Sequence, residues 1–453
     1  MAAGRTTRIT ALVAATAVAA LLAAGASAGP TATTGGKATV TLKFWIMNNG
    51  PAPVQDMERI LQPFERQSGI DVDVQLVGWD VQFQRITNAA LSGEAPDVTQ
   101  AGTTQVAYFA ALNGFENLQG RVGQIGGRAA YPSGVWQTSQ VVGRPGVWGV
   151  PWFSEARTIY YRTDIFKRLK INPNKAFRNW DSFRATLNRL SRLKYHKGRR
   201  IHPLGQPGKT AWDLVHHVMP FVWAAGGTEL SSNASRSAIA GPRAVTGVKY
   251  FADLVNRGWV MKAGLEMNAP QVENLFKAGQ LATWIGGPWV VAAAARADDK
   301  NWHPDARNNF AVAQMPAGPT GRSYTFAGGS NLMMFKTSQN KNEAWQLIRY
   351  LSQPKVQLDY AKLMGMLPAR KTPQQTLAKG NNKWDAFYRA LARGRTYAPI
   401  PAWGAIEGAY KTRFGNILDI AAGQGRTTYN RSAVVSELRA AEREANALIA
   451  QGS

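Results

Sequence analysis

The chain has 453 residues, 45% of them hydrophobic, with a formal net charge of +25 at pH 7 and no Cys. The missing thiols exclude disulfide bonds, Cys nucleophiles and thiolate metal sites, so a large core must stabilise a chain long enough for two domains. The basic residues are scattered, apart from local clusters such as the one at 194–200, and accompany no nucleic-acid motif. We therefore expect a solvated basic surface rather than a nucleic-acid-binding protein.

The N-terminus has the layout of a secretory signal peptide. Arg5 and Arg8 precede an almost wholly apolar stretch at 9–24, and 26–28 reads Ala-Ser-Ala. A basic start, a short apolar stretch and an A-x-A site predict a signal peptide over 1–28, cleaved after its last residue. The apolar stretch is short for a membrane span, which needs about 20 residues.

A small, polar leader at 29–37 is expected to be flexible, and alternating elements follow it. Apolar residues alternate as in strands at 40–46 and 70–76, and recur at helical spacing at 54–64 and 83–91. Strands that alternate with helices imply a parallel sheet covered on both faces.

The same pattern resumes beyond residue 150. We predict strands at 158–161, 310–315 and 332–335, and helices at 180–193, 244–257, 270–278, 288–297, 343–351 and 434–449, the first of these capped by Asp181 or Ser182. Two α/β lobes fit this length, and the crevice between such lobes is where a small ligand binds.

Five segments occur in an order that carries a family resemblance. They are 41–45 (TLKFW); 93–98 (GEAPDV) with 102–104; 149–156 (GVPWFSEA) with 159–164; 276–282 (FKAGQLA) with 286–289 (GGPW); and 328–331 (GGSN) with 365–370 (GMLPAR). Together the chain from about 40 to 372 resembles family 1 extracellular solute-binding proteins, the maltose- and trehalose-binding type that serves bacterial ABC importers.

The resemblance implies an α/β fold of the type II periplasmic-binding-protein kind, with a ligand cleft between two lobes. Three hinge crossings are expected near 148–152, 310–316 and 350–354. One lobe then combines 38–148 with 316–350, and the other combines 152–310 with 354–453.

The resemblance also implies a function without catalysis. We expect the protein to bind a disaccharide or short oligosaccharide and pass it to the permease subunits of an ABC importer. No cofactor or metal is expected, and the protein is expected to be a monomer. Many relatives carry a lipid-modified Cys; the absence of Cys here predicts an exported protein that is soluble after signal cleavage.

Two residues are the leading candidates for ligand contact. In the family, the Trp that matches Trp289 stacks on a sugar, and an acid at the position of Glu155 bonds ring hydroxyls. Charge-assisted hydrogen bonds suit that role. The alternatives are a core position for Trp289 and a salt bridge to Arg157 for Glu155.

Other candidates follow from their place in the predicted fold. Asn48 and Asn49 end the first strand, where α/β folds place ligand groups, although an Asn-Gly turn also explains them. Thr103 and Thr104 match a cleft-facing family loop in which many relatives carry a charged residue. The remaining candidates, each with a core, turn or solvated alternative, are Trp79, Trp152, Phe153, Trp212, Trp223, Trp403, Gly287, Gly329, Asn331 and Arg370.

Two other functions stay open at this stage. A secreted glycoside hydrolase needs a pair of carboxylates that spacing cannot reveal, and a polyanion-binding exported protein would use the positive charge. The ligand itself is not specified, so amino sugars, uronates and polyol phosphates stand beside neutral sugars. His216 and His217 are adjacent, so we expect their side chains to diverge rather than form a catalytic pair. We also discount ferric ion binding by Tyr160 and Tyr161, because adjacent strand residues face opposite ways.

Overall fold

A computed structural model describes residues 40–297, 299–379 and 381–451. The predicted signal peptide at 1–28 and the predicted leader at 29–37 lie outside the described residues. Within the described ranges, no helix combines the length and apolar character needed to cross a membrane.

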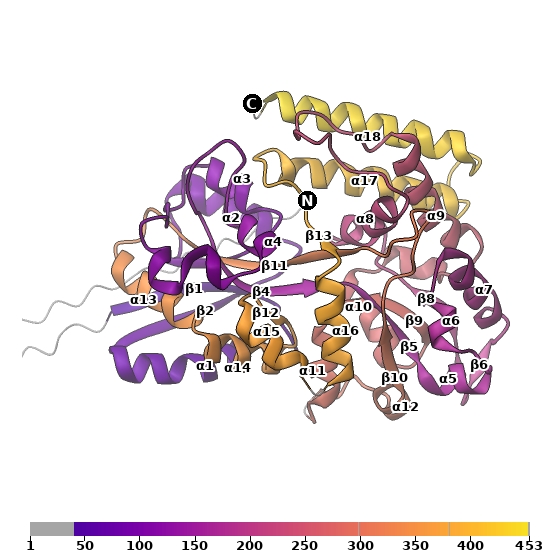
Figure 1. The fold of residues 1–453 in the computed structure, drawn as a ribbon, viewed down its shortest axis with the longest axis horizontal. Helices are drawn as coiled ribbons and strands as arrows, with labels where there is room; N and C mark the ends of the chain where they lie inside the picture. Colours follow the sequence, from indigo (N-terminus) through magenta and orange to yellow (C-terminus); the bar gives the residue numbers. More distant parts are fainter. Residues whose placement is uncertain (1–39, 298, 380, 452–453) are drawn as a thin grey trace, which may run out of the picture. The chain divides into compact units, whose positions relative to one another are not determined.

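The larger of two main sheets has seven strands, in the order β12-β4-β11-β3-β1-β2 with β13 paired to β11. β1 runs parallel to β2 and β3, whereas β11 is antiparallel to both β3 and β4. Figure 1 shows β4 and β11 side by side although they are far apart in the chain. The strands are β1 (Val40–Met47), β2 (Ile70–Val77), β3 (Val98–Gly102), β4 (Val150–Ala156), β11 (Thr325–Met334), β12 (Leu367–Pro368) and β13 (Gly394–Arg395).

The smaller sheet has four strands in the order β10-β5-β9-β8. β8 and β9 are parallel, and the other two pairs are antiparallel. A separate two-stranded hairpin is formed by β6 (Tyr195–His196) and β7 (Arg199–Arg200). The strands of the smaller sheet are β5 (Thr158–Arg162), β8 (His202–Gly205), β9 (Leu281–Gly286) and β10 (Phe310–Ala313).

Helices follow most strands, as the alternating pattern predicts, and α17 and α18 lie side by side near the C-terminus (Figure 1). The α-helices are α1 (Pro53–Ser68), α2 (Gln82–Ser92), α3 (Val106–Ala111), α4 (Ser133–Gln137), α5 (Thr163–Arg168), α6 (Pro173–Ala176), α7 (Trp180–Leu190), α8 (Leu214–Ala224), α9 (Pro242–Asn256), α10 (Ala269–Lys277), α11 (Trp289–Ala295), α12 (Pro304–Asn308), α13 (Lys341–Leu351), α14 (Pro354–Met364), α15 (Lys371–Ala378), α16 (Asn382–Leu391), α17 (Trp403–Ala421) and α18 (Arg431–Gln451). Among the described residues, short 3₁₀ helices lie at Val122–Ile125, Gly127–Ala130 and Lys262–Glu266.

The predicted strands and helices are present, with differences at their ends. The helix predicted at 180–193 ends at Leu190, and its cap is Asn179 rather than Asp181 or Ser182. The Asn179 side chain accepts a hydrogen bond from the Ser182 N–H at 3.0 Å, and the Asn179 N–H donates to the Ser182 hydroxyl at 3.3 Å. This reciprocal capping box satisfies two backbone groups at once, which neither predicted cap would do.

One residue, Arg157, separates β4 of the larger sheet from β5 of the smaller sheet. The resemblance predicts this crossing near 148–152, whereas pairing with β11 and β12 extends the larger sheet to Ala156. All seven residues of β4 are buried, because the strand has neighbours on both sides. The chain therefore changes sheet at a buried Arg.

Candidate functional site

A cavity of about 950 Å³ is lined by loops that belong to both main sheets. Nine of the sixteen candidate residues line it, and they approach from well-separated parts of the chain. The nine are Asn48, Trp79, Thr103, Thr104, Phe153, Glu155, Trp212, Trp289 and Gly329.

Three lining loops follow parallel strands of the larger sheet. Asn48 comes directly after β1, Trp79 lies two residues beyond β2, and Thr103 and Thr104 follow β3. Because the carboxyl ends of parallel strands meet at one edge of a sheet, these side chains converge there. The strand pattern of the sequence therefore leads directly to this wall of the cavity.

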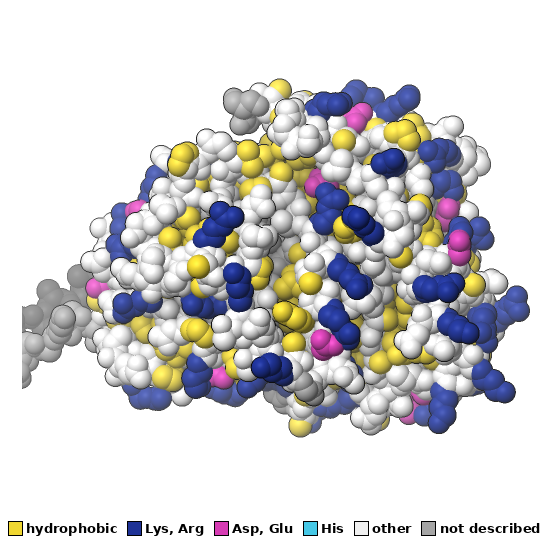
Figure 2. Space-filling model, in the orientation of Figure 1, with side chains coloured by type: hydrophobic (Ala, Val, Ile, Leu, Met, Phe, Trp, Pro, Cys, Tyr) yellow, Lys and Arg dark blue, Asp and Glu magenta, His cyan; other side chains and the backbone are white. Residues whose placement is uncertain are grey.

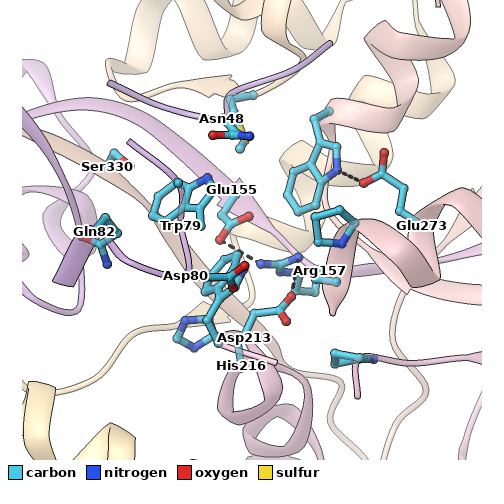
Figure 3. Close-up of a pocket in the computed structure, with 18 of the residues that line it drawn as sticks. Asn48, Trp79, Asp80, Gln82, Glu155, Arg157, Asp213, His216, Glu273 and Ser330 are labelled. Atoms are coloured by element: carbon cyan, nitrogen blue, oxygen red, sulfur yellow. Dashed lines mark hydrogen bonds and ion pairs between the residues drawn. The ribbon is translucent and has the colours of Figure 1, made fainter. Parts of the chain in front are cut away.

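The centre of the site is the Arg157 guanidinium, which Figure 3 shows between Glu155 and Asp213. Its Nη2 lies 3.3 Å from Glu155 Oε1, and its Nη1 lies 3.5 Å from Asp213 Oδ2. The guanidinium carbon also lies 4.8 Å from the centre of the Trp289 ring, a cation–π distance. One cation thus orients two carboxylates and an indole.

The Trp289 indole is held from two further sides. Its Nε1–H donates to Glu273 Oε2 at 2.6 Å, and Lys277 pairs with the other Glu273 oxygen at 2.7 Å. A Cβ on Gly287 would lie 1.8 Å from the indole, so only Gly permits this ring position. The ring is partly exposed where it lines the cavity.

Trp79 and Trp212 form the other aromatic element of the site. Their ring centroids lie 5.1 Å apart with an angle of 14° between planes, which is a stacked geometry. Trp79 follows a strand of the larger sheet, and Trp212 lies between β8 and α8 on the side of the smaller sheet. The stack thus joins loops from the two sheets across one wall.

Burial governs the ionisation of the lining carboxylates. Burial raises the pKa of Glu155 although Arg157 opposes the shift, and burial raises the pKa of Glu407 to about 7. Asp213 differs: burial opposes its ionisation, but His217 and Arg157 outweigh it and hold the Asp213 pKa at about 2. Burial lowers the pKa of His216 and of His217, so both imidazoles are neutral near pH 7.

Across the ranges that the structure describes, no three His, Asp or Glu residues come together in an arrangement that could hold a metal ion. The polar groups that line the cavity are instead suited to hydrogen bonding, and the indoles to stacking.

Comparison with known proteins identifies the family. Residues 48–358 match the model of the bacterial extracellular solute-binding proteins. The chain belongs to this family. Among the relatives of this solute-binding protein is the diacetylchitobiose-binding protein DasA of Streptomyces coelicolor, 25% identical over 379 residues that cover 82% of this chain and 83% of the relative.

Solved structures of related receptors match the fold over most of the chain. The sugar-binding protein MalE of Xanthomonas citri is 26% identical with a TM-score of 0.70, covering 91% of this chain and 98% of that one. A solute-binding protein of Thermotoga lettingae, solved with α-D-tagatose, is 23% identical with a TM-score of 0.78, covering 91% and 100%. The solute-binding protein therefore has the predicted two-lobe α/β fold.

Seven candidates do not line the cavity. Trp152, Trp223 and Trp403 are buried in the core, where Trp152 stacks on Tyr360 with ring centroids 4.8 Å apart. The Trp223 and Trp403 indoles donate to Glu229 and Glu407 at 2.8 and 2.9 Å. A Trp in the core is expected to be buried with its indole N–H hydrogen-bonded, and Trp223 and Trp403 meet both conditions.

The other four are structural. Asn49 is fully buried and donates to Gln100 Oε1 at 2.7 Å, and Asn331 is fully buried and donates to Thr138 at 3.1 Å. Arg370 donates to the Ile125 carbonyl at 2.7 Å and so is not available to a ligand in the cavity. Gly287 acts indirectly, through the space that it leaves for Trp289.

Several lining residues were not predicted as ligand contacts. The sequence indicates Arg157 only as a partner for Glu155, and it gives no signal for Asp213 although that residue adjoins a candidate Trp. The side chains of His216 and His217 do diverge, yet both line the cavity. His216 stacks on Phe326 at 3.9 Å between ring centres, while His217 Nε2 lies 3.2 Å from Asp213 Oδ2. Glu273, Gln82 and Glu407 carried no signal in the sequence.

Proposed function

We propose that the protein is the extracytoplasmic substrate-binding component of an ABC importer and that its ligand is a disaccharide or short oligosaccharide. The observation that carries the proposal is a cavity of about 950 Å³ lined by four indoles, those of Trp79, Trp212, Trp284 and Trp289, and by several carboxylates. Ligand pockets of roughly 300–1,000 Å³ suit molecules of that size. The disaccharide in the name of the relative DasA supports the same class.

The chemistry of the lining matches the surface of a sugar. Apolar C–H groups on a pyranose face need a flat, desolvated partner, which Trp289 offers. Ring hydroxyls need fixed acceptors and donors, which Glu155, Asn48 and Thr103 offer from the larger-sheet side. We propose that one pyranose ring of the ligand stacks against the Trp289 indole.

Binding without hydrolysis is part of the proposal. The relatives are binding proteins, and Glu155 and Asp213 are both tied to Arg157 rather than free to act as acid and base. The purified protein is incubated with maltose, trehalose and cello-oligosaccharides, and products are sought by chromatography. Intact sugar is expected; turnover would establish the hydrolase alternative instead.

Ligand binding is tested directly by calorimetry and by the shift in melting temperature. A panel of maltose, trehalose, cellobiose, N,N′-diacetylchitobiose and maltotriose is expected to contain at least one sugar that binds. A panel in which none binds would count against the proposal. Retention on heparin at physiological salt would favour the polyanion alternative.

The proposal also covers the export of the protein, its oligomeric state and its transport partner. We propose cleavage after Ala28, release as a soluble monomer, and delivery of the sugar to permease subunits. Sequencing of the mature N-terminus and light scattering on the secreted protein test the first two points. A chain that begins at Met1 in the membrane fraction, or a dimer in solution, would contradict them.

A further inference from the structure

The charge of the cavity is opposite to that of the protein. The chain as a whole has 53 Lys and Arg against 28 Asp and Glu. Figure 2 shows the surface counterpart, with many basic and few acidic side chains on the visible face. Apart from His216 and His217, whose pKa values burial lowers, the ionisable residues that line the cavity reverse this balance, with six acids and four bases: Asp80, Glu155, Asp213, Glu273, Asp299 and Glu407 against Arg157, Lys277, Lys300 and Lys411.

The two buried cations of the lining are already paired. Arg157 lies between Glu155 and Asp213, at 3.3 and 3.5 Å. Lys277 lies between Glu273 and Asp299, at 2.7 and 3.3 Å. An anionic ligand would therefore have to compete with two fixed carboxylates for each cation.

The other two lining cations lie nearer to solvent. Lys300 is exposed and donates to the Ala297 carbonyl at 3.2 Å, and Lys411 is half-buried. Solvent screens charges at such positions, so neither offers a strong site for a carboxylate or a phosphate.

The acids, in contrast, include carboxylate oxygens that accept no hydrogen bond or that face solvent. Asp213 is 1% exposed and its Oδ1 has no hydrogen-bond partner. Asp80, labelled in Figure 3, is an exposed carboxylate on the loop after β2 that also lines the cavity. Burial raises the pKa of Glu155, and it raises that of Glu407 to about 7, so the Glu407 carboxylate is negatively charged only above that pH.

We infer that the cleft selects its saccharide by charge: it accepts neutral and amine-bearing sugars and rejects uronates and phosphorylated sugars. The inference rests on the proposed function and narrows it to a ligand class. An ammonium group would gain acceptors and relieve the mutual repulsion of the carboxylates. A carboxylate would add to that repulsion in a site shielded from water.

Matched derivatives of one sugar test the inference. Maltose, trehalose, cellobiose and N,N′-diacetylchitobiose are each compared with a 6-amino-6-deoxy form and a 6-carboxy form, by calorimetry at pH 8, above the Glu407 pKa of about 7. For the parent that binds, the carboxy form is expected to bind at least tenfold more weakly, and the amino form at least as tightly. A carboxy form that equals or exceeds its parent overturns the inference alone. Failure of every compound to bind overturns the proposed function, and the inference falls with it.

Two variants separate charge from size. Glu155→Gln and Asp213→Asn keep the side-chain shape and remove one negative charge, so the ratio of parent to carboxy affinity is expected to shrink severalfold in at least one of them. Asp305→Asn on α12, which does not line the cavity, is the matched control and should keep the ratio. A ratio unchanged in both cavity variants would mean that the carboxy form is excluded by size, which overturns the inference.

Discussion

Trp79 and Trp212 stack on each other with ring centroids 5.1 Å apart, although they follow strands of different sheets. The contact lies in the wall of the cavity that we propose as the sugar site. Because an aromatic pair is held together only while both loops are in place, the stack reports on the relative position of the two sheets. Removal of either ring should therefore lower the affinity for the ligand.

The stack is tested by a double-mutant cycle. We expect Trp79→Ala and Trp212→Ala each to weaken sugar binding, and the double variant to lose less than the sum. The coupling expected for an aromatic pair is about 0.5–1.5 kcal/mol, measured by calorimetry with the sugar found in the panel. Tyr195→Ala, which removes an exposed aromatic outside the cavity, is the control. Strictly additive losses would show that the two rings act independently.

Trp289→Ala should reduce affinity while leaving the fold intact. Loss of the stacking plane removes about 1–2 kcal/mol, which is roughly a tenfold change in Kd. Trp289→Phe keeps a plane but loses the hydrogen bond to Glu273, so a smaller loss is expected. The contrast is Trp223→Phe in the core, which should lower Tm and leave affinity unchanged. Parental affinity in Trp289→Ala would move the stacking site to Trp79 and Trp212.

Glu407 should make stability depend on pH. Its pKa rises from an ordinary value of 4.5 to about 7 on folding, so the folded protein binds more protons than the unfolded chain between these values. The stability from this group is therefore present below about pH 4.5 and lost as pH rises through about 7, by up to about 3 kcal/mol. The pKa of Asp213, about 2, changes stability only at lower pH.

The test compares melting temperatures at pH 5 and pH 8. Glu407→Gln keeps an acceptor for the Trp403 indole and cannot titrate, so we expect it to lose less stability over this interval than the parent. Glu437→Gln, in a partly exposed pair with Arg413, should behave like the parent. Parallel curves for parent and Glu407→Gln would contradict the prediction.

Asp56 on α1 and Arg296, just beyond α11, form an ion pair between segments far apart in the chain. Arg296 Nη1 lies 2.5 Å from Asp56 Oδ2, and the Asp56 side chain is fully buried. Arg296→Ala would leave a buried carboxylate without this partner, at a cost of about 3 kcal/mol in urea unfolding. Arg389→Ala, which breaks the exposed pair with Asp385, should change stability by less than about 1 kcal/mol. Equal effects of both substitutions would contradict a buried role for the Asp56 pair.

The sequence predicted the architecture well because its signals are periodic. The alternating residues at 40–46 and 70–76 form β1 and β2. The residues at helical spacing at 343–351 and 434–449 form α13 and α18. These patterns reflect burial of one face, which the fold must satisfy wherever the segment ends up. The loops after parallel strands were likewise located, because their position follows from the strand order.

The assignment of individual Trp residues to core or cavity could not be made in this way. Trp212 and Trp223 both adjoin or lie in α8, yet the first lines the cavity and the second is 1% exposed. The difference depends on partners from distant segments, Trp79 for one and Glu229 for the other. The role of Glu273 could not be predicted for the same reason, because only folding brings its carboxylate to the Trp289 indole.

The single-residue junction at Arg157 has a mechanical consequence. β4 and β5 belong to different sheets, and only this residue lies between them. Rotation of one sheet against the other must therefore be absorbed in the backbone torsions around Arg157, and the same torsions aim its guanidinium at Glu155 and Asp213. The junction therefore couples the angle between the sheets to the position of the charged centre, so we expect a sugar that orders one to order the other.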